Sequence, residues 1–367
     1  MQKTRTKSSK TGVFLIGCSL YSKPFPASYD VLKIITLSNL FQYVLADFYP
    51  LEQRLGWTKM QFSSLINLIR IRNKFNIKLV VMHQQCFPLL CLLSRLLGCK
   101  VLIYVGGSPF YPNENEPKTK NRLSRIVALI GNLSLHICFL FSSFLVVPSK
   151  ELIKSFNIEK YAWKTLAAPT RIINIKTFKQ TTQSKDRNRQ IAYIGRLSQE
   201  KGIDIVIKTF LKLAKMDPEL KFIIIGDGPL MNSVKYEVSK SNFDERIKIA
   251  GWLKPKDIVV SLNKVKLILV PSRSEGLPSV LLESMACGTP AMVSFAGVMK
   301  YVVQDNYNGF HLNSADPDNI ARTICLILKE EENLQDISKR AHEYVATRYS
   351  EEAVLKVWLP ILRRLRN

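Results

Sequence analysis

The sequence predicts an α/β protein with two domains, each a parallel sheet covered by helices. Short apolar runs rich in β-branched residues alternate with amphipathic helical patterns along the whole chain, and this alternation is typical of parallel sheets. The length of 367 residues exceeds what one ordinary hydrophobic core accommodates. A composition of 47% hydrophobic and 22% charged residues excludes a disordered chain and a polytopic membrane protein.

The first half of the chain begins with the apolar run 13–16, which we expect to be a buried strand that ends in a loop at Gly17. Basic residues precede this run and Cys18 follows it, but the run is shorter than the ~7–15 residues of a signal-peptide core. Residues 126–148 are long enough to span a bilayer. Polar interruptions and the β-rich end of this stretch favour instead a buried helix followed by a strand.

We expect the domain boundary in residues 180–189, a ten-residue stretch without an apolar side chain. This stretch directly precedes a clear strand at 191–194. The predicted domains are therefore residues 1–182 and residues 190–349. Residues 350–367 form a separate amphipathic helix.

Two carboxylates lie in the segment Ser274–Pro290, which reads SEGLPSVLLESMACGTP. Glu275 is in a loop that follows the buried strand 267–270, and Glu283 is one turn into the next helix, which begins at residue 278 or 279. Ligands of open α/β sheets bind at such carboxyl ends of strands. Carboxylates there accept hydrogen bonds from several hydroxyls at once, which a sugar or a ribose offers.

A second block carries two cations, Arg196 and Lys201, between the strand 191–194 and a helical pattern that begins at Ile203. A turn at Gly195 precedes them, so both cations lie where a helix N-terminus already favours anions. Arginine binds phosphate oxygens in pairs, and lysine acts as a mobile point charge. Together the two residues can neutralise a diphosphate.

Two further strands end in loops of the same kind. The strand 222–225 ends at Gly226 in a Gly-Asp-Gly loop, and the run 247–251 is followed by Trp252 and Leu253. A lone Gly-Asp-Gly is weak evidence of a binding loop. Trp252 taken alone is equally compatible with a core position.

Taken together, these four segments resemble the donor-binding signature of the family-4 (group 1) retaining glycosyltransferases, which have a GT-B fold of two Rossmann-like domains facing across a cleft. The resemblance implies that Glu275 holds the hexose of a nucleotide sugar and that Glu283 holds its ribose. It implies a catalytic role for Glu275, Arg196 and Lys201, in which the two cations stabilise the departing diphosphate without a metal. The donor contacts that it implies are completed by Gly17, Gly195, Gly226, Trp252, Leu253, Gly276, Leu277 and Pro278. In this fold the last helix commonly crosses back to the first domain.

The sequence offers no convincing site for a metal or another cofactor. Asp316-Pro317-Asp318 matches a metal-binding Asp-x-Asp motif, but it opens a helix at Asn319 and is better explained as a helix cap. The seven cysteines lie mostly in apolar runs and show no zinc-type spacing, which predicts reduced core residues of a cytoplasmic protein. We therefore expect no cofactor besides the donor substrate, a nucleoside diphosphate sugar.

The net charge of +24 is concentrated in the first half of the chain. Residues 1–180 contain 25 Lys and Arg against 7 Asp and Glu, whereas residues 181–367 contain 28 against 22. Basic surface beside apolar helices such as 87–97 suggests contact with an anionic membrane, where each nearby cation contributes about 1 kcal/mol. Nucleic acid would attract the same charge, but no nucleic-acid-binding motif accompanies it. A generally basic proteome is the other alternative.

The predicted function is transfer of a hexose-type sugar to a glycan or lipid-linked acceptor at the cytoplasmic face of a membrane, as in polysaccharide or glycoconjugate synthesis. The first half departs from the family pattern, because it has residues 105–109 where a functional histidine is common. His83, after the strand 79–82, is the one histidine there that a strand end would direct toward a cleft. A nucleotide-sugar epimerase or hydrolase of the same fold and a non-catalytic nucleotide-sugar-binding scaffold are the alternatives.

Overall fold

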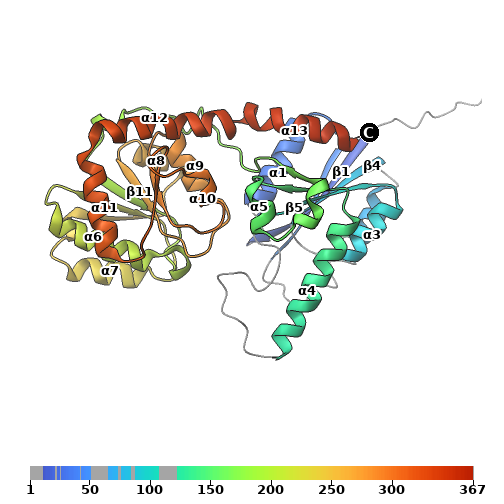
Figure 1. The fold of residues 1–367 in the computed structure, drawn as a ribbon, viewed down its shortest axis with the longest axis horizontal. Helices are drawn as coiled ribbons and strands as arrows, with labels where there is room; N and C mark the ends of the chain where they lie inside the picture. The colour runs from blue at the N-terminus through green and yellow to red at the C-terminus, as the bar shows by residue number, and fades with distance from the viewer. Residues whose placement is uncertain are drawn as a thin grey trace, which may run out of the picture. The chain divides into compact units, whose positions relative to one another are not determined.

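The computed structural model describes residues 11–20, 23–24, 26–41, 43–50, 65–72, 76–83, 87–106 and 122–366. The chain divides into two compact units (Figure 1): unit 1 comprises residues 1–172 with 354–367, and unit 2 comprises residues 173–353. The division falls at residue 173, so the polar stretch 180–189, where we expected the boundary, lies inside unit 2.

The polar stretch 180–189 packs in unit 2 through hydrogen bonds instead of apolar contacts. The guanidinium of Arg187 is buried and donates to the carbonyl oxygens of Thr182, at 2.9 Å, and Cys287, at 2.6 Å. It also donates to the hydroxyl of Thr289. A buried guanidinium needs acceptors for its N–H groups, and the chain around Arg187 is positioned to supply them. A stretch without apolar side chains is therefore not a linker here.

Unit 1 is built on a seven-stranded sheet in the order β2-β1-β4-β5-β6-β7, with β3 paired to β1. The strands are β1 (Thr11–Leu20), β2 (Lys23–Pro24), β3 (Tyr43–Pro50), β4 (Asn76–His83), β5 (Lys100–Tyr104), β6 (Phe144–Val147) and β7 (Thr165–Ala167). Gly17 lies inside β1, opposite Phe48 of β3, so the expectation of a loop at Gly17 is wrong. The strand continues to Leu20 because β3 and then β2 pair with its backbone beyond Gly17.

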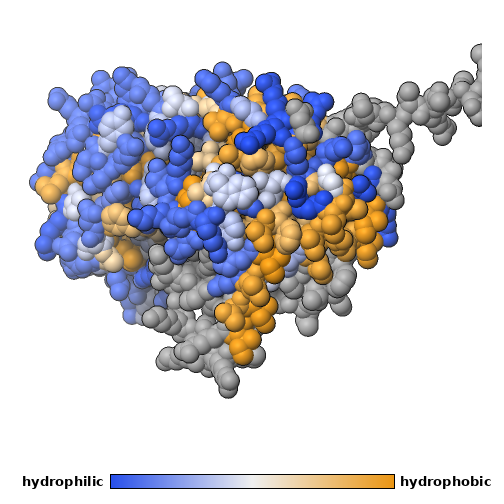
Figure 2. All heavy atoms as spheres, turned by 45° about the vertical axis from the view of Figure 1, so that its right-hand side comes forward, coloured by the Kyte–Doolittle hydropathy of each residue, from blue (hydrophilic) through white to orange (hydrophobic). Residues whose placement is uncertain are grey.

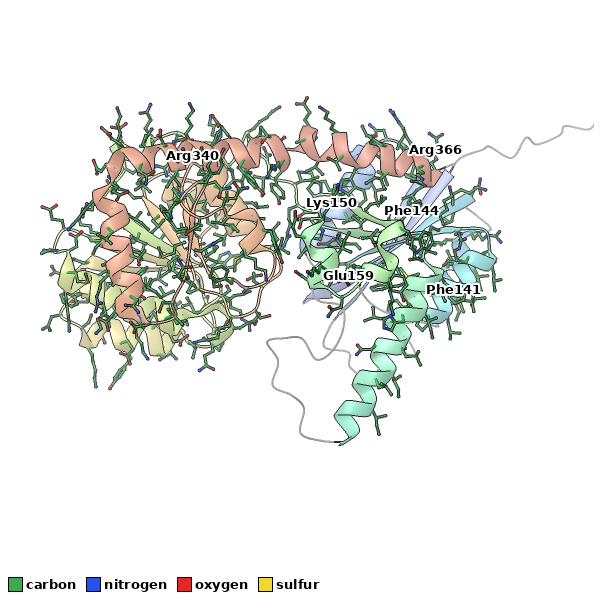
Figure 3. All side chains as sticks on the ribbon, in the orientation of Figure 1. Phe141, Phe144, Lys150, Glu159, Arg340 and Arg366 are labelled. Carbon is green, nitrogen blue, oxygen red and sulfur yellow. The ribbon has the colours of Figure 1, made fainter. Side chains whose placement is uncertain are left out.

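Helices cover both faces of the sheet of unit 1 (Figure 1). The core on one face combines α1 (Pro26–Leu37) with α13 (Glu351–Arg366). The buried Trp358 of α13 donates its indole N–H to the carbonyl oxygen of Pro169 at 2.7 Å, and Arg364 lies over the ring of Phe144. Figure 3 labels Phe144 and, at the end of α13, Arg366. The other face carries α3 (Pro88–Leu96) and α4 (Arg122–Phe141), which pack on each other.

The stretch 126–148 forms the predicted helix and strand, but the helix is more exposed than we expected. It forms the helix α4 followed by the strand β6, as the sequence predicts. The helix is not buried all round, because Cys138 and Phe139 are buried whereas Leu129 is 71% exposed. Among the residues that the structure describes, no helix is long and apolar enough to cross a membrane.

Unit 2 is built on a six-stranded parallel sheet in the order β10-β9-β8-β11-β12-β13. The strands are β8 (Gln190–Ile194), β9 (Lys221–Ile225), β10 (Ile247–Gly251), β11 (Leu267–Val270), β12 (Ala291–Val293) and β13 (Phe310–His311). On one face lie α6 (Ile203–Met216), α7 (Met231–Lys240) and α11 (Pro317–Lys329), and on the other lie α8 (Pro255–Leu262), α9 (Ser279–Ala286) and α10 (Met299–Val302) (Figure 1). The long helix α12 (Glu331–Arg348) packs on α9.

Candidate active site

The strand order of the sheet in unit 2 reverses between β8 and β11. From β8 the sheet continues with β9 and β10 on one side, and with β11, β12 and β13 on the other. The loops that follow β8 and β11 meet at the carboxyl edge of the sheet, where open α/β proteins bind ligands. The first loop carries Arg196 and Lys201, and the second carries Glu275.

Lys201 and Glu275 form an ion pair that joins these two loops. Their side chains are mostly shielded from solvent, and Glu200 approaches the same ammonium only to 3.8 Å. Phosphate oxygens bind an ammonium, and sugar hydroxyls donate to a carboxylate. A ligand that carries a phosphate and a sugar can therefore separate the pair: its phosphate binds Lys201, and its hydroxyls donate to Glu275.

Tyr193, at the end of β8, supports the first loop. Its hydroxyl donates to the carbonyl oxygen of Arg196 at 2.7 Å. Burial, and then the charge of the nearby Glu275, raise the pKa of Tyr193. The hydroxyl therefore keeps its proton and remains a donor, while the side chain of Arg196 is exposed at the edge of the site.

Arg273 and Asp204, which sequence reasoning missed, connect the same two loops. Two guanidinium nitrogens of Arg273 donate to the two carboxylate oxygens of Asp204, at 2.8 and 2.6 Å. The backbone N–H of Arg273 donates to the carbonyl oxygen of Glu200 at 2.8 Å. Such a bidentate pair fixes orientation as well as distance, so it positions the segment that holds Lys201. The sequence signal that could have identified Arg273 is its position two residues before Glu275.

Two glycines allow the loops of the site to approach each other closely. Gly226 has a φ of +137°, and a side chain there would collide with the carbonyl oxygen of Gly195. Gly297 has a φ of +57°, and a side chain there would collide with the carbonyl oxygen of Glu275. Only glycine adopts a positive φ readily and also has no side chain to collide with the neighbouring loop. Gly226 was expected at the site, whereas Gly297 was missed because nothing in the sequence shows what it packs against.

The helix α9 begins at Ser279, as predicted, and follows Pro278 directly. The helix dipole makes this end of α9 positive. Glu283 lies one turn along α9 and is partly buried. The side chain of Leu277 is buried, so Leu277 can offer a ligand only its backbone. The neighbouring carbonyl of Gly276 accepts from the amide of Val298 at 3.1 Å.

Trp252 and Leu253 follow β10, two strands away from β8. Two strand spacings correspond to about 10 Å, which is compatible with a base lying beyond a diphosphate bound at β8. Trp252 is 82% exposed, which excludes the alternative that it is a core residue.

Other residues singled out in the sequence lie outside this group of loops in unit 2. Gly17 belongs to unit 1, and its contact with the donor stays a prediction. His83 ends β4 as expected, but its side chain lies outside the described part of the chain, as do residues 107–109. Asp316 caps α11 by accepting from the amide of Asn319 at 3.2 Å, which confirms the helix-cap interpretation.

The five cysteines whose side chains the structure describes form no disulfide bond, and four of them are buried. Cys91, Cys99, Cys138 and Cys287 are the buried ones, as expected for reduced core residues, whereas Cys325 is partly exposed. Cys18 and Cys86 have side chains outside that part. Within the described residues, no cluster of three or more His, Cys, Asp or Glu could hold a metal ion.

Residues 174–344, which lie within unit 2 and contain the whole site, match the family model of glycosyl transferases group 1. The match covers 171 of the 367 residues, and this part of the chain is similar to that family. Solved structures place the two units in the GT-B fold: the Anabaena protein HepE in complex with UDP has a TM-score of 0.75 at 14% identity, and the match covers 96% of this chain and all of that one.

Curated relatives match over shorter lengths. An uncharacterized glycosyltransferase of Methanocaldococcus jannaschii is 28% identical over 165 residues, which is 45% of each chain. The N-acetyl-alpha-D-glucosaminyl L-malate synthase of Bacillus anthracis is 24% identical over 229 residues, or 61% of this chain and 57% of that protein. The chain thus spans about half the length of the curated relatives that it matches.

Proposed function

We propose that the protein is a retaining glycosyltransferase that moves a hexose-type sugar from a nucleoside diphosphate sugar to a hydroxyl of a glycan or lipid-linked acceptor. The observation that carries this proposal is the pairing of Lys201 with Glu275 where the strand order of unit 2 reverses. A cation for phosphate and a carboxylate for sugar hydroxyls lie there within one ligand's reach. The retaining stereochemistry rests on the family resemblance.

Catalysis in this proposal depends on stabilising the departing diphosphate. Lys201 and Arg196 would bind its oxygens, and the N-terminus of α9 would add the positive end of a helix dipole. Glu275, released from Lys201, would accept hydrogen bonds from the sugar and face the positive charge that develops at its anomeric carbon. Glu283 would hold the ribose. Arg273 keeps the two loops in place, so these groups are oriented before the donor binds.

The UDP bound to HepE makes UDP-sugars the first donors to test. We propose that turnover needs no metal, because Arg196 and Lys201 supply fixed positive charge and the one Asp-x-Asp motif caps a helix. Activity should therefore persist in excess chelator. Abolition of turnover by chelator, with rescue by manganese, would contradict this part of the proposal.

We also propose that the protein works at the anionic, cytoplasmic face of a membrane, as a peripheral protein. The support is the charge of unit 1, which holds 27 Lys and Arg against 7 Asp and Glu. Such an excess attracts anionic lipid within about one Debye length, ~8 Å at physiological ionic strength. A lipid-linked acceptor would be presented at that same surface.

The decisive experiment is calorimetry of the full chain against a panel of nucleotide sugars, followed by turnover assays with and without candidate acceptors. The proposal predicts donor binding and a glycosylated product that forms only when an acceptor is added. Product in the absence of an acceptor would favour an epimerase or hydrolase of the same fold. Donor binding without turnover across the acceptor panel would favour a non-catalytic scaffold.

A further inference from the structure

Three neighbouring helices of unit 1 form one continuous surface: the helix at residues 65–72, α3 and α4. The guanidinium of Arg72 donates to the carbonyl oxygen of Leu97, just after α3, at 2.7 Å. The thiol of Cys91 in α3 donates to the carbonyl oxygen of Cys138 in α4 at 3.4 Å. These two bonds join the first helix to the second and the second to the third.

Large apolar side chains project from this surface into solvent. We call it the apolar face and define it by Ile66, Leu96, Leu129, Ile130, Leu133 and Leu140, all of them exposed. Figure 2 shows hydrophobic atoms gathered along α4 and on the surface beside it. Contiguous exposed apolar surface of this kind marks an interaction site in a soluble protein.

The helix α4 shows that the exposure is organised. Leu135, Cys138 and Phe139 are buried on the side that packs in unit 1. Leu129 and Leu133, one turn apart, are exposed on the opposite side. The helix thus has an apolar side toward the core and a second apolar side toward solvent, so its outer side is suited to a partner that is itself apolar.

The charges on the three helices all have one sign. Their sequences contain five arginines and no aspartate or glutamate; the arginines are Arg70, Arg72, Arg95, Arg122 and Arg125. At the end of α4, the ammonium of Lys164 donates to the carbonyl oxygen of Leu140 at 2.9 Å. This bond places the short helix η2 (Glu159–Lys164) beside the apolar face, and its Trp163 is 81% exposed.

An anionic bilayer matches both properties of the apolar face. A second copy of this chain would bring exposed arginines such as Arg70 and Arg95 together, and the three helices carry no carboxylate to offset them, which opposes self-association through this face. Anionic headgroups pair with arginine, the acyl boundary accepts leucine and isoleucine, and tryptophan prefers the interface between them. We propose that the apolar face docks the protein on an anionic lipid bilayer, with α4 lying in the plane of the interface.

This inference deepens the membrane contact of the proposed function by naming the surface that makes it. The test is flotation of the full chain with vesicles of phosphatidylcholine containing phosphatidylglycerol, and with phosphatidylcholine alone. The wild type should bind the anionic vesicles at least tenfold more tightly than the neutral ones. Leu129→Ser with Leu133→Ser should weaken binding to anionic vesicles about tenfold or more, because two exposed leucines no longer leave water.

The matched control is Leu326→Ser on α11 of unit 2, where the leucine is 62% exposed on a helix outside the apolar face. It should bind vesicles as the wild type does. In a second measurement, lipids brominated in their acyl chains should quench tryptophan fluorescence of the wild type, and Trp163→Phe should remove most of that quenching. This readout does not depend on the leucine variants.

Three results would overturn the inference: unchanged vesicle binding by the double leucine variant, equal loss in the Leu326→Ser control, or a dimer in solution that the double variant converts to monomer. UDP affinity measured on the same samples separates the two proposals. Vesicle binding without UDP binding would remove the donor-site proposal and leave the membrane face. UDP binding without vesicle binding would remove the membrane-docking proposal and leave the donor-site proposal.

Discussion

The two units share one architecture and use it differently. Each has helices on both faces of a sheet that is parallel apart from the short antiparallel strand β2 of unit 1. Yet unit 1 carries 27 Lys and Arg against 7 Asp and Glu, whereas unit 2 carries 26 against 22. In unit 2 the charges meet each other within the site, as Lys201 with Glu275 and Arg273 with Asp204. In unit 1 the arginines of three helices accompany exposed leucines. This difference is the basis of the two proposals, a donor site in unit 2 and a membrane-docking surface in unit 1.

Buried charged groups also have different surroundings in the two units. In unit 2 the buried Arg187 has fixed neutral acceptors, the carbonyl oxygens of Thr182 and Cys287 among them. In unit 1 the shielded Asp30 faces Arg171 at 3.3 Å. Burial raises the pKa of Asp30 to about 6 despite the opposing charge of Arg171. Burial lowers the pKa of Arg187 to about 10, which leaves its guanidinium charged at neutral pH, whereas the raised pKa of Asp30 lets that carboxyl take up its proton just below neutral pH.

The largest effect should come from Arg187→Met. The change leaves several buried carbonyl oxygens without donors, which should lower the free energy of unfolding by about 3–5 kcal/mol. Calorimetric unfolding of the full chain measures the loss. Lys185→Met, an exposed cation two residues earlier, should change stability little. Equal effects of the two substitutions would show that residues 180–189 behave as a linker after all.

Next in size is the pH dependence due to Asp30. Its folded pKa, about 6, lies above the ordinary aspartate value of 3.8, so the folded state binds a proton more tightly than the unfolded chain does. Stability should therefore fall as pH rises from about 4 to about 6, by at most about 3 kcal/mol, and then level off. Urea unfolding across this range should show the fall in the wild type and lose that component in Asp30→Asn. An identical pH profile in both proteins would contradict the assignment, and the exposed Asp186→Asn serves as control.

Sequence reasoning succeeded where neighbours along the chain decide the structure. The strands β8, β9 and β11 and the start of α9 at Ser279 follow from apolar runs and the turn residues that end them. Because parallel strands align their carboxyl ends, the loops carrying Lys201 and Glu275 could be expected at one edge of a sheet. The ion pair between them, across 74 positions, was not predicted from the sequence.

Sequence reasoning failed where distant contacts decide. The acceptor Cys287 of Arg187 lies 100 positions away, so the stretch 180–189 looked like a linker. The pairing of β1 with β3 extends the strand past Gly17, and no local pattern shows that. The outer side of α4 looked buried because apolar spacing does not reveal which side of a helix has a neighbour.

Within the site, Glu275→Gln should lower kcat about 10²-fold or more. The amide keeps the shape and can still hydrogen-bond, but it loses the charge that faces the developing positive centre of the sugar, comparable to loss of one transition-state contact. Steady-state turnover at saturating donor measures the change. Glu200→Gln, an exposed carboxylate near the same lysine, should leave kcat nearly unchanged. Wild-type turnover by Glu275→Gln would remove Glu275 from the catalytic group.

Glu283→Gln should have a smaller effect that falls on binding. The ribose is common to the nucleotide sugar and the free nucleoside diphosphate, so both should bind more weakly in this variant. A 2′-deoxy or 3′-deoxy analogue of the diphosphate should lose less affinity in Glu283→Gln than in the wild type, because the partner of that hydroxyl has already changed. Unchanged diphosphate affinity would rule out the ribose assignment.

The central claim is that the Lys201–Glu275 pair opens when the donor binds, so that Lys201 binds the diphosphate and Glu275 binds the sugar. Its most direct test is calorimetric titration of UDP and uridine into the wild type and two variants. Lys201→Ala should weaken UDP about tenfold or more, as loss of a charge-assisted bond implies, and leave uridine unchanged, whereas Lys208→Ala, an exposed cation on α6, should change neither. Glu275→Gln should bind UDP at least as tightly as the wild type, because the carboxylate no longer competes for Lys201. Equal loss of UDP and uridine affinity in Lys201→Ala, or weaker UDP binding in Glu275→Gln, would contradict the account.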